Sequence, residues 1–184
     1  MDNYFNHKVA WITGASSGIG EALAYALSAT GANVILSSRR TPELERVKAY
    51  CAFPENVAIL PLDLLDIPSL ESNVPEAIGC FGRVDIMVHN GGVTQRSLVA
   101  DTDLAVHRQI MELNYFSYIA LTKALLPHFI ERKAGHLVVT SSVMGKIGTP
   151  MRAGYAAAKH ALPGYFDCLR AEVSSHTIKV TILT

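Results

Sequence analysis

Tyr155 and Lys159 stand four residues apart in the segment AGYAAAKHAL, with three alanines between them. Side chains at positions i and i+4 share one face of a helix, so the phenol and the amine are expected to be neighbours. A nearby ammonium stabilises the phenolate form of a tyrosine. Such a tyrosine can act as general acid in a reduction and as general base in an oxidation. The small residues between the pair leave room for a ligand against the helix, although the spacing alone also occurs by chance.

Two further polar residues extend this pair. Ser142 directly follows a β-branched run at 135–141, where its hydroxyl would hold a carbonyl oxygen beside the phenol. Asn114 lies inside a long helical pattern, and asparagine is a poor helix former. It is a candidate to hold a water that connects Lys159 to solvent. The structural alternatives are ordinary turn chemistry for Ser142 and a local helix distortion, satisfied by backbone, for Asn114.

A glycine-rich turn, ITGASSGIGEAL, joins the first β-branched run to a helical pattern. Glycines let the backbone approach a pyrophosphate closely, and the start of the helix offers free N–H groups to phosphate. The position of the turn, between a strand and an amphipathic helix, favours dinucleotide binding over a purely structural role. The predicted contacts come from Gly14, Ser16, Ser17, Gly18, Ile19 and Gly20.

The second β-branched run ends in SSRR, without the acidic residue that holds the adenosine ribose in NAD sites. A guanidinium binds a 2′-phosphate through paired hydrogen bonds, each contributing about 1.5–3 kcal/mol. One such bond would favour NADP over NAD by roughly ten- to a hundredfold. Arg39 is preferred over Arg40, since it directly follows the position an aspartate would occupy. The alternative is two solvated surface arginines.

The elements expected to position these groups are short β-branched runs that alternate with helical patterns. Several runs are apolar on both faces, as in a parallel sheet that is covered on both sides. This order predicts the doubly wound parallel sheet of a three-layer α/β/α Rossmann fold, which binds ligands beyond the carboxyl ends of its strands. The predicted strands are 8–13, 32–38, 56–62, 84–89, 135–141 and 178–183.

Two long helical patterns carry prolines. The first covers 102–130, where Pro127 predicts a bend or an end. The second covers 153–174, where Pro163 and Gly164 are expected to disturb the helix.

The length suits a single domain over 1–184, and the chain stops directly after the sixth predicted strand, so the fold is expected to be truncated there. Hydrophobic residues make up 49% and charged residues 17%, which is typical of a globular protein. Sixteen basic and sixteen acidic side chains cancel, which argues against a nucleic-acid partner.

Cys51, Cys80 and Cys168 are far apart and form no CxxC pair. We therefore expect no disulfide framework, no zinc or other metal site, and a reducing compartment, taken as the cytoplasm. No secretory signal and no membrane-spanning run are found, so a soluble protein is predicted.

Together these motifs resemble the short-chain dehydrogenase/reductase family, and several segments are similar to its animal dehydrogenase/reductase member 7 subgroup. The family's TGxxxGxG is matched from Thr13 to Gly20, and its NNAG appears as HNGG, with His89 and Gly91 as departures. The resemblance implies that Asp63 contacts adenine and that Asn90 and Gly91 belong to the cofactor site, where Asn90 mainly makes backbone contacts that hold the sheet. It also implies a catalytic tetrad formed by Asn114, Ser142, Tyr155 and Lys159.

The resemblance implies an oxidoreductase that interconverts a secondary alcohol and a ketone or aldehyde with a nicotinamide cofactor, which Tyr155 and Lys159 also contact. The arginines of SSRR predict that this cofactor is NADP(H). It further implies a homodimer or homotetramer built from the two long helical regions. The family's nicotinamide turn and substrate loop after the sixth strand have no counterpart here. A non-catalytic NADP-binding module or an inactive truncated homologue is therefore the main alternative. An extended-type sugar-nucleotide epimerase is a third, and it would need a longer chain.

Overall fold

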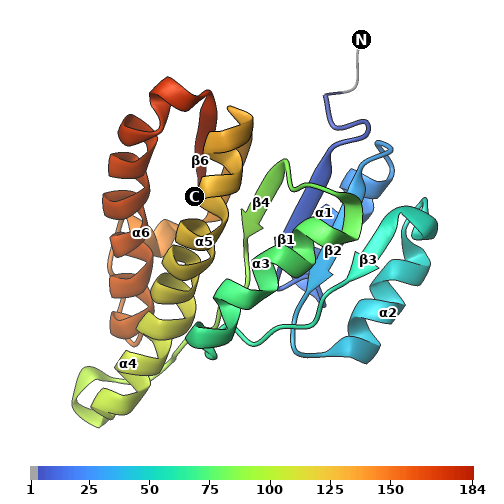
Figure 1. Ribbon diagram of the computed structural model, residues 1–184. Coiled ribbons are helices and arrows are strands. Elements are labelled where there is room, and N and C mark those ends of the chain that lie inside the picture. Colours follow the sequence, from blue (N-terminus) through green and yellow to red (C-terminus); the bar gives the residue numbers. More distant parts are fainter. Residues whose placement is uncertain (1–3) are drawn as a thin grey trace.

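The computed structural model describes residues 4–184, which form a six-stranded sheet with the order β3-β2-β1-β4-β5-β6 (Figure 1). Every strand pair is parallel. The chain starts at the centre, runs outward to β3 and returns to β4, so the strand order reverses between β1 and β4. This confirms the predicted doubly wound sheet. The strands are β1 (Val9–Thr13), β2 (Asn33–Ser37), β3 (Val57–Ile59), β4 (Ile86–His89), β5 (Gly135–Thr140) and β6 (Ile178–Leu183).

Helices cover both faces of the sheet, because right-handed crossovers to the left and right of β1 place them on opposite sides. Helices α1 and α2 pack on one face, and α3, α5 and α6 pack on the other (Figure 1). The helices are α1 (Gly18–Ser28), α2 (Thr41–Tyr50), α3 (Ile67–Phe81), α4 (Leu104–Met111), α5 (Ser117–Arg132) and α6 (Ala153–Glu172). Short 3-10 turns lie at η1 (Pro54–Asn56), η2 (Val99–Asp101), η4 (Val143–Gly145) and η5 (Ser174–His176).

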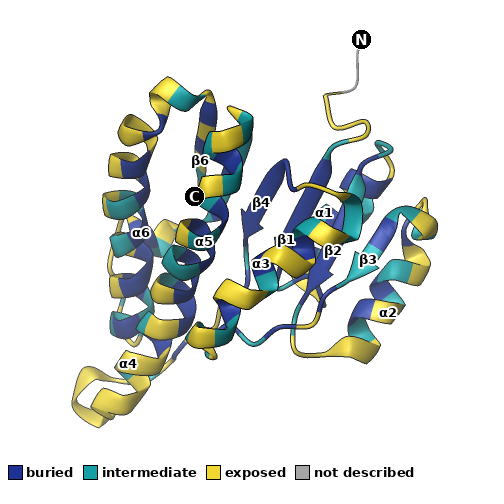
Figure 2. Ribbon diagram, in the orientation of Figure 1, coloured by how far each residue is buried: buried dark blue, intermediate teal, exposed yellow. Residues whose placement is uncertain are grey.

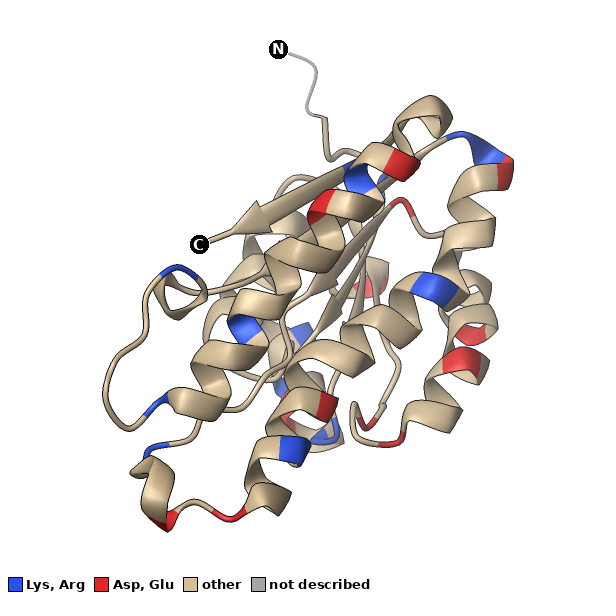
Figure 3. Ribbon diagram, turned by 90° about the vertical axis from the view of Figure 1, so that its left-hand side faces the viewer, with Lys and Arg blue, Asp and Glu red and all other residues tan. Residues whose placement is uncertain are grey.

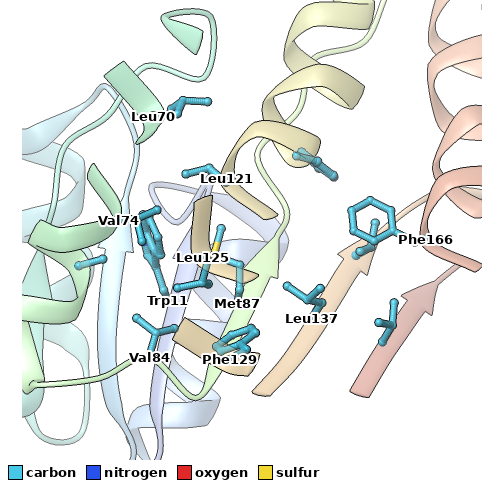
Figure 4. Packing of buried hydrophobic residues seen from close by; sticks show 14 of the residues in the cluster. Trp11, Leu70, Val74, Val84, Met87, Leu121, Leu125, Phe129, Leu137 and Phe166 are labelled. Atoms are coloured by element: carbon cyan, nitrogen blue, oxygen red, sulfur yellow. The ribbon is translucent and has the colours of Figure 1, made fainter. Parts of the chain in front are cut away.

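Alternate strand residues feed two separate cores. On the α3/α5/α6 side, Trp11 and Met87 from the sheet pack with Leu125 and Phe129 of α5 and with Phe166 of α6 (Figure 4). The strand residues between them, such as Ile12 and Val88, point to the α1/α2 side. Figure 2 shows the result, a fully buried β1 between two layers of half-buried helices. This rigid centre holds the carboxyl ends of β1 and β4 side by side.

The first long helical pattern is not one helix. It begins at Leu104 as α4, passes through a π-helical turn at η3 (Glu112–Phe116) and continues as α5 to Arg132. Pro127 therefore neither ends nor interrupts α5, and only the carbonyl one turn earlier loses its partner. The π-turn places Asn114 in the one distorted part of this region, in agreement with its low helix propensity.

The second long helix, α6, is continuous through Pro163 and Gly164, so the predicted disturbance was wrong. Proline lacks an N–H, which leaves the carbonyl of Lys159 without its usual partner four residues on. The hydroxyl of Ser141 donates to that carbonyl at 3.3 Å instead. Pro163 thus opens a hydrogen-bonding position that fastens the end of β5 to the middle of α6.

Charged residues of both signs are mixed over the helices (Figure 3). The three cysteines are free thiols. Within residues 4–184, no helix has the length and apolarity needed to cross a membrane. The same residues contain no group of three or more histidine, cysteine, aspartate or glutamate side chains that could hold a metal ion.

Candidate active site

A cleft of about 430 Å³ lies at the reversal point of the sheet, above the carboxyl ends of the strands. Its walls include most of the predicted cofactor residues, namely Gly14, Ser16, Ser17, Ile19, Arg39, Arg40, Asp63, Asn90 and Gly91. Sequence reasoning missed Ser37, Ser38, Leu62, Leu64, Gly92, Val93 and Leu113 as lining residues. Several of these residues directly precede or follow a predicted residue in the sequence. Extending each motif by one residue would therefore have identified them. Gly18, Gly20, Tyr155 and Lys159 are not among the lining residues.

The glycine turn is built so tightly that side chains are excluded. Gly14 has a φ of +66°, and a Cβ there would lie 2.6 Å from the Cα of Gly91. A Cβ on Gly20 would lie 2.3 Å from the carbonyl oxygen of Gly14. Gly18 also has a positive φ, +59°, but open space surrounds it. Gly14 and Gly20 thus let the turn close on itself, and Gly18 supplies the bend at the start of α1.

Asn90 fastens β4 to this turn. Its backbone N–H donates to the Thr13 hydroxyl at 3.1 Å, and its side-chain amide donates to the carbonyls of Thr13 and Gly14 at 3.2 and 3.3 Å. Asp63 lies across the cleft, where its carboxylate accepts from the N–H of Leu65 at 3.0 Å. Asn90 therefore has a scaffolding position, and Asp63 is held at the cleft wall.

Arg39 and Arg40 both line the cleft, but they differ in how they are held. The guanidinium of Arg40 donates to the hydroxyls of Ser16 and Ser17, each at 3.0 Å. Arg39 is exposed, and it makes no side-chain hydrogen bond to the rest of the described chain. The structure thus anchors Arg40 to the turn and leaves Arg39 unattached.

A charged cluster behind the turn locks α1 to α2. Arg46 pairs with Glu21 at 2.7 Å and with Glu43 at 2.8 Å. Its guanidinium also donates to the carbonyl of Ser16 at 3.4 Å. Hydrogen bonds from Arg46 and Tyr25 lower the pKa of Glu21 to about 2, so the cluster keeps its charges at neutral pH. This cluster therefore supports the turn at Ser16.

Lys159 is buried at the carboxyl end of the sheet, with 3% of its surface exposed. Its ammonium donates to the carbonyl oxygen of Thr140 at 2.7 Å and lies 5.8 Å from the ring centroid of Tyr155. Desolvation lowers the pKa of Lys159 to about 8. The amine therefore remains mostly protonated at pH 7, next to the phenol, as the i,i+4 spacing predicted.

Ser142 lies at the start of the turn η4, directly after β5. Its Oγ accepts a hydrogen bond from the N–H of Met144 at 3.1 Å. A hydroxyl has one proton to donate in addition to its acceptor sites, so the Ser142 hydroxyl keeps that proton available. Turn η4 packs against α6, where a Cβ on Gly145 would lie 2.9 Å from the Lys159 carbonyl. This close packing brings the end of β5 to the helix that carries Tyr155 and Lys159.

Asn114 is completely buried and bonded to Val93. Its side-chain oxygen accepts from the Val93 N–H at 2.9 Å, and its side-chain amide donates to the Val93 carbonyl at 2.8 Å. Val93 lines the cleft, so Asn114 holds the wall of the cleft. Both functional groups of the side chain are occupied by this backbone, the arrangement that the structural alternative described.

Gln95 and Arg152 connect the loop after β4 to the start of α6, and no sequence motif marked either of them. The amide oxygen of Gln95 accepts from the N–H of Gly154 at 3.2 Å, and its amide group donates to Ser97 at 3.0 Å. Arg152 donates to the carbonyl of Gln95 at 3.1 Å and to the hydroxyl of Thr94. These bonds fix the first turn of α6, which begins at Ala153 and contains Tyr155.

The cleft fits a dinucleotide. Its wall includes the glycine turn, which packs so closely at Gly14 and Gly20 that a Cβ at either position would meet backbone atoms. The N–H groups at the start of α1 have no helical partners and suit phosphate. The cleft wall just after the end of β2 carries two cations and a hydroxyl, from Arg39, Arg40 and Ser38. The cleft thus has residues that suit a phosphate. The buried amine of Lys159 and the phenol of Tyr155 lie at the same edge of the sheet, outside the residues that line the cleft.

Comparison with known proteins agrees with this reading. The family model for short chain dehydrogenases matches residues 8–184. A crystal structure of a short-chain dehydrogenase from Streptomyces avermitilis superposes with a TM-score of 0.91 at 37% identity, covering 96% of this chain and 64% of that one.

Among curated proteins, human dehydrogenase/reductase SDR family member 7 is 50% identical over 173 residues, covering 91% of this chain and 51% of the relative. A Drosophila melanogaster member 7-like protein is 44% identical over 189 residues, covering 99% of this chain and 57% of that protein. Mouse member 7B is 40% identical over 186 residues, with 98% and 58% covered. The chain thus spans about half the length of the curated relatives it matches.

Proposed function

The chain belongs to the short-chain dehydrogenase family, and on this basis we propose that it is an NADP(H)-dependent oxidoreductase. The reaction would interconvert a secondary alcohol and a ketone or aldehyde. The observation that carries the proposal is the position of the buried Lys159 ammonium beside Tyr155. Both lie at the edge of the sheet where the glycine turn forms part of the cleft. A buried cation is costly to keep, and its place next to a phenol favours a chemical role.

Each residue has a separate part in the proposed reaction. The bound nicotinamide would supply or accept the hydride. Tyr155 donates a proton to the carbonyl oxygen in reduction and takes one from the alcohol in oxidation. The Lys159 ammonium stabilises the phenolate that this transfer leaves, and its remaining N–H groups are available to ribose hydroxyls. The free hydroxyl proton of Ser142 orients the same carbonyl oxygen.

Asn114 contributes by holding Val93 at the cleft wall. A proton relay through its side chain would have to break both bonds to Val93, so its relay role would fall to a water held by the backbone of the π-turn. In such a turn the backbone departs from the regular α-helical hydrogen-bond pattern.

The test of the proposal is to titrate the protein with NADPH by fluorescence and to assay a generic diketone with the same sample. Saturable binding followed by diketone-dependent oxidation of NADPH is the expected result. Tight binding without oxidation would favour the alternative, a nucleotide-binding module without turnover.

The preference for NADP over NAD is expected to depend on Arg39 and Arg40, which follow the end of β2. Arg39→Asp should weaken NADPH binding by roughly ten- to a hundredfold and leave NADH binding nearly unchanged, because the lost bonds go only to the 2′-phosphate. Arg40→Asp should weaken both cofactors, since Arg40 also holds the serines of the glycine turn. The measurement is the dissociation constant of each cofactor with each variant.

Lys123→Asp on the exposed side of α5 is the matched control, because it makes the same change in net charge. Equal weakening of NADPH by Lys123→Asp and Arg39→Asp would show a general field effect. If the ratio of the NADPH and NADH dissociation constants is unchanged in both arginine variants, neither arginine binds the 2′-phosphate.

We also propose a cytoplasmic homodimer or homotetramer. The free cysteines suit a reducing compartment. Leu104 and Val106 of α4 and Phe116 of η3 are 59%, 37% and 44% exposed. Exposed apolar groups along the long helices are typical of subunit contacts.

A further inference from the structure

A second tyrosine, Tyr118 of α5, lies between the cleft and the catalytic lysine. Its side chain is fully buried. The ammonium of Lys159 lies over its ring, 5.5 Å from the centroid. Its hydroxyl donates to the carbonyl of Gly91, on the cleft wall, at 3.1 Å. One side chain therefore touches both the amine and the dinucleotide cleft.

His89 stacks on this ring, at the position where the family motif has asparagine. The two rings are stacked, with centroids 4.9 Å apart and an interplanar angle of 21°. The Nε2 of His89 is paired with the Thr122 hydroxyl at 2.8 Å. Burial lowers the pKa of His89 to about 3, so the imidazole is neutral at physiological pH and adds no second cation beside the ring.

The Lys159 ammonium is stabilised by uncharged partners, because no carboxylate in residues 4–184 forms an ion pair with it. The carbonyl of Thr140 supplies one hydrogen bond. The electron-rich faces of Tyr118 and Tyr155 supply the remaining electrostatic attraction. Attraction between a cation and an aromatic face is stronger when both are shielded from water, as Lys159 and Tyr118 are.

We infer that Tyr118 is a positioning residue, whose ring keeps Lys159 protonated beside Tyr155 and whose hydroxyl fixes Gly91 at the cleft. The inference rests on the proposed role of Lys159. The two contacts come from different parts of one side chain. Phenylalanine keeps the ring and loses the hydroxyl, and leucine loses both, so the contacts can be separated by substitution.

The test is a titration of the cofactor-free protein labelled with ¹³C at lysine Cε, followed by NMR. The Lys159 signal is assigned by its loss in Lys159→Met. Tyr118→Leu should lower the apparent pKa of Lys159 by about one unit, while Tyr118→Phe should leave it close to that of the wild type. Tyr165→Leu, which removes a half-buried ring elsewhere on α6, is the matched control and should cause no shift.

The hydroxyl contact is tested by the dissociation constant of NADPH. Tyr118→Phe should weaken binding by roughly two- to tenfold, the effect of one lost hydrogen bond. Wild-type affinity in this variant would overturn the role of the hydroxyl. A folded Tyr118→Leu protein with an unshifted Lys159 would overturn the role of the ring.

If Tyr118→Leu does not fold, the wild-type protein still decides the matter. A nuclear Overhauser effect between the Lys159 ε-protons and the Tyr118 ring protons is expected, and its absence would contradict the contact. The titration and this measurement use neither cofactor nor substrate. A failure of the proposed enzymatic function would therefore leave their results unchanged.

Discussion

Tyr155→Phe is expected to reduce carbonyl-dependent NADPH oxidation by about 10²–10⁴-fold, while the dissociation constant of NADPH stays nearly the same. The substitution removes only the oxygen that carries the proton. It keeps the ring that lies 5.8 Å from the Lys159 ammonium. Initial rates under saturating diketone and a fluorescence titration of NADPH measure the two quantities on one preparation.

The control for this substitution is Tyr50→Phe, which removes a phenolic oxygen from a side chain that is 74% exposed on α2. It should retain full turnover. Tyr155→Phe with wild-type turnover would exclude Tyr155 as the proton donor. A parallel loss of NADPH affinity would instead show that the phenol serves mainly in binding.

His89→Asn is expected to change how the stability of the protein depends on pH. Burial lowers the pKa of His89 to about 3, whereas a histidine in an unfolded chain has a pKa near 6.5. Between these values the unfolded chain binds a proton that the folded chain does not. The contribution of the neutral imidazole is therefore complete above about pH 6.5 and is lost progressively as the pH falls toward 3.

The wild type should accordingly lose about 1.4 kcal/mol of unfolding free energy per pH unit relative to His89→Asn below pH 6.5. At pH 5 the relative loss should be about 2 kcal/mol. Urea unfolding at pH 7.5, 6 and 5 measures the difference, and His160→Asn on the exposed side of α6 is the control. Parallel stability curves for wild type and His89→Asn would mean that the imidazole already titrates normally in the folded protein.

The sheet and the glycine turn were predictable because their signals are local. Buried β-branched runs specify strands, and the steric demands at Gly14 and Gly20 leave no other residue type. The i,i+4 pairing of Tyr155 with Lys159 was predictable for the same reason, since helical geometry alone brings the two together. Helix α3, which carries Pro68 and Pro75, was not singled out.

The remaining features depend on contacts between distant segments. Pro163 was expected to disturb its helix, and the hydroxyl of Ser141, from another element, satisfies the carbonyl that it frees. The anchoring of Arg40 depends on two serines of the glycine turn, more than twenty residues earlier. Tyr118 belongs to no sequence motif, because its importance arises only from its position between Lys159 and Gly91 in the folded chain.

The central claim is that Tyr155, assisted by Lys159, exchanges a proton with a carbonyl oxygen beside a nicotinamide that is bound in the cleft. Its most direct test is incubation with NADPH carrying deuterium at the transferable C4 position and a prochiral ketone, followed by mass spectrometry of the product. The account predicts deuterium on the carbinol carbon with wild type and none above background with Tyr155→Phe. Saturable NADPH binding with no label in any alcohol product, across a panel of ketones and aldehydes, would contradict it.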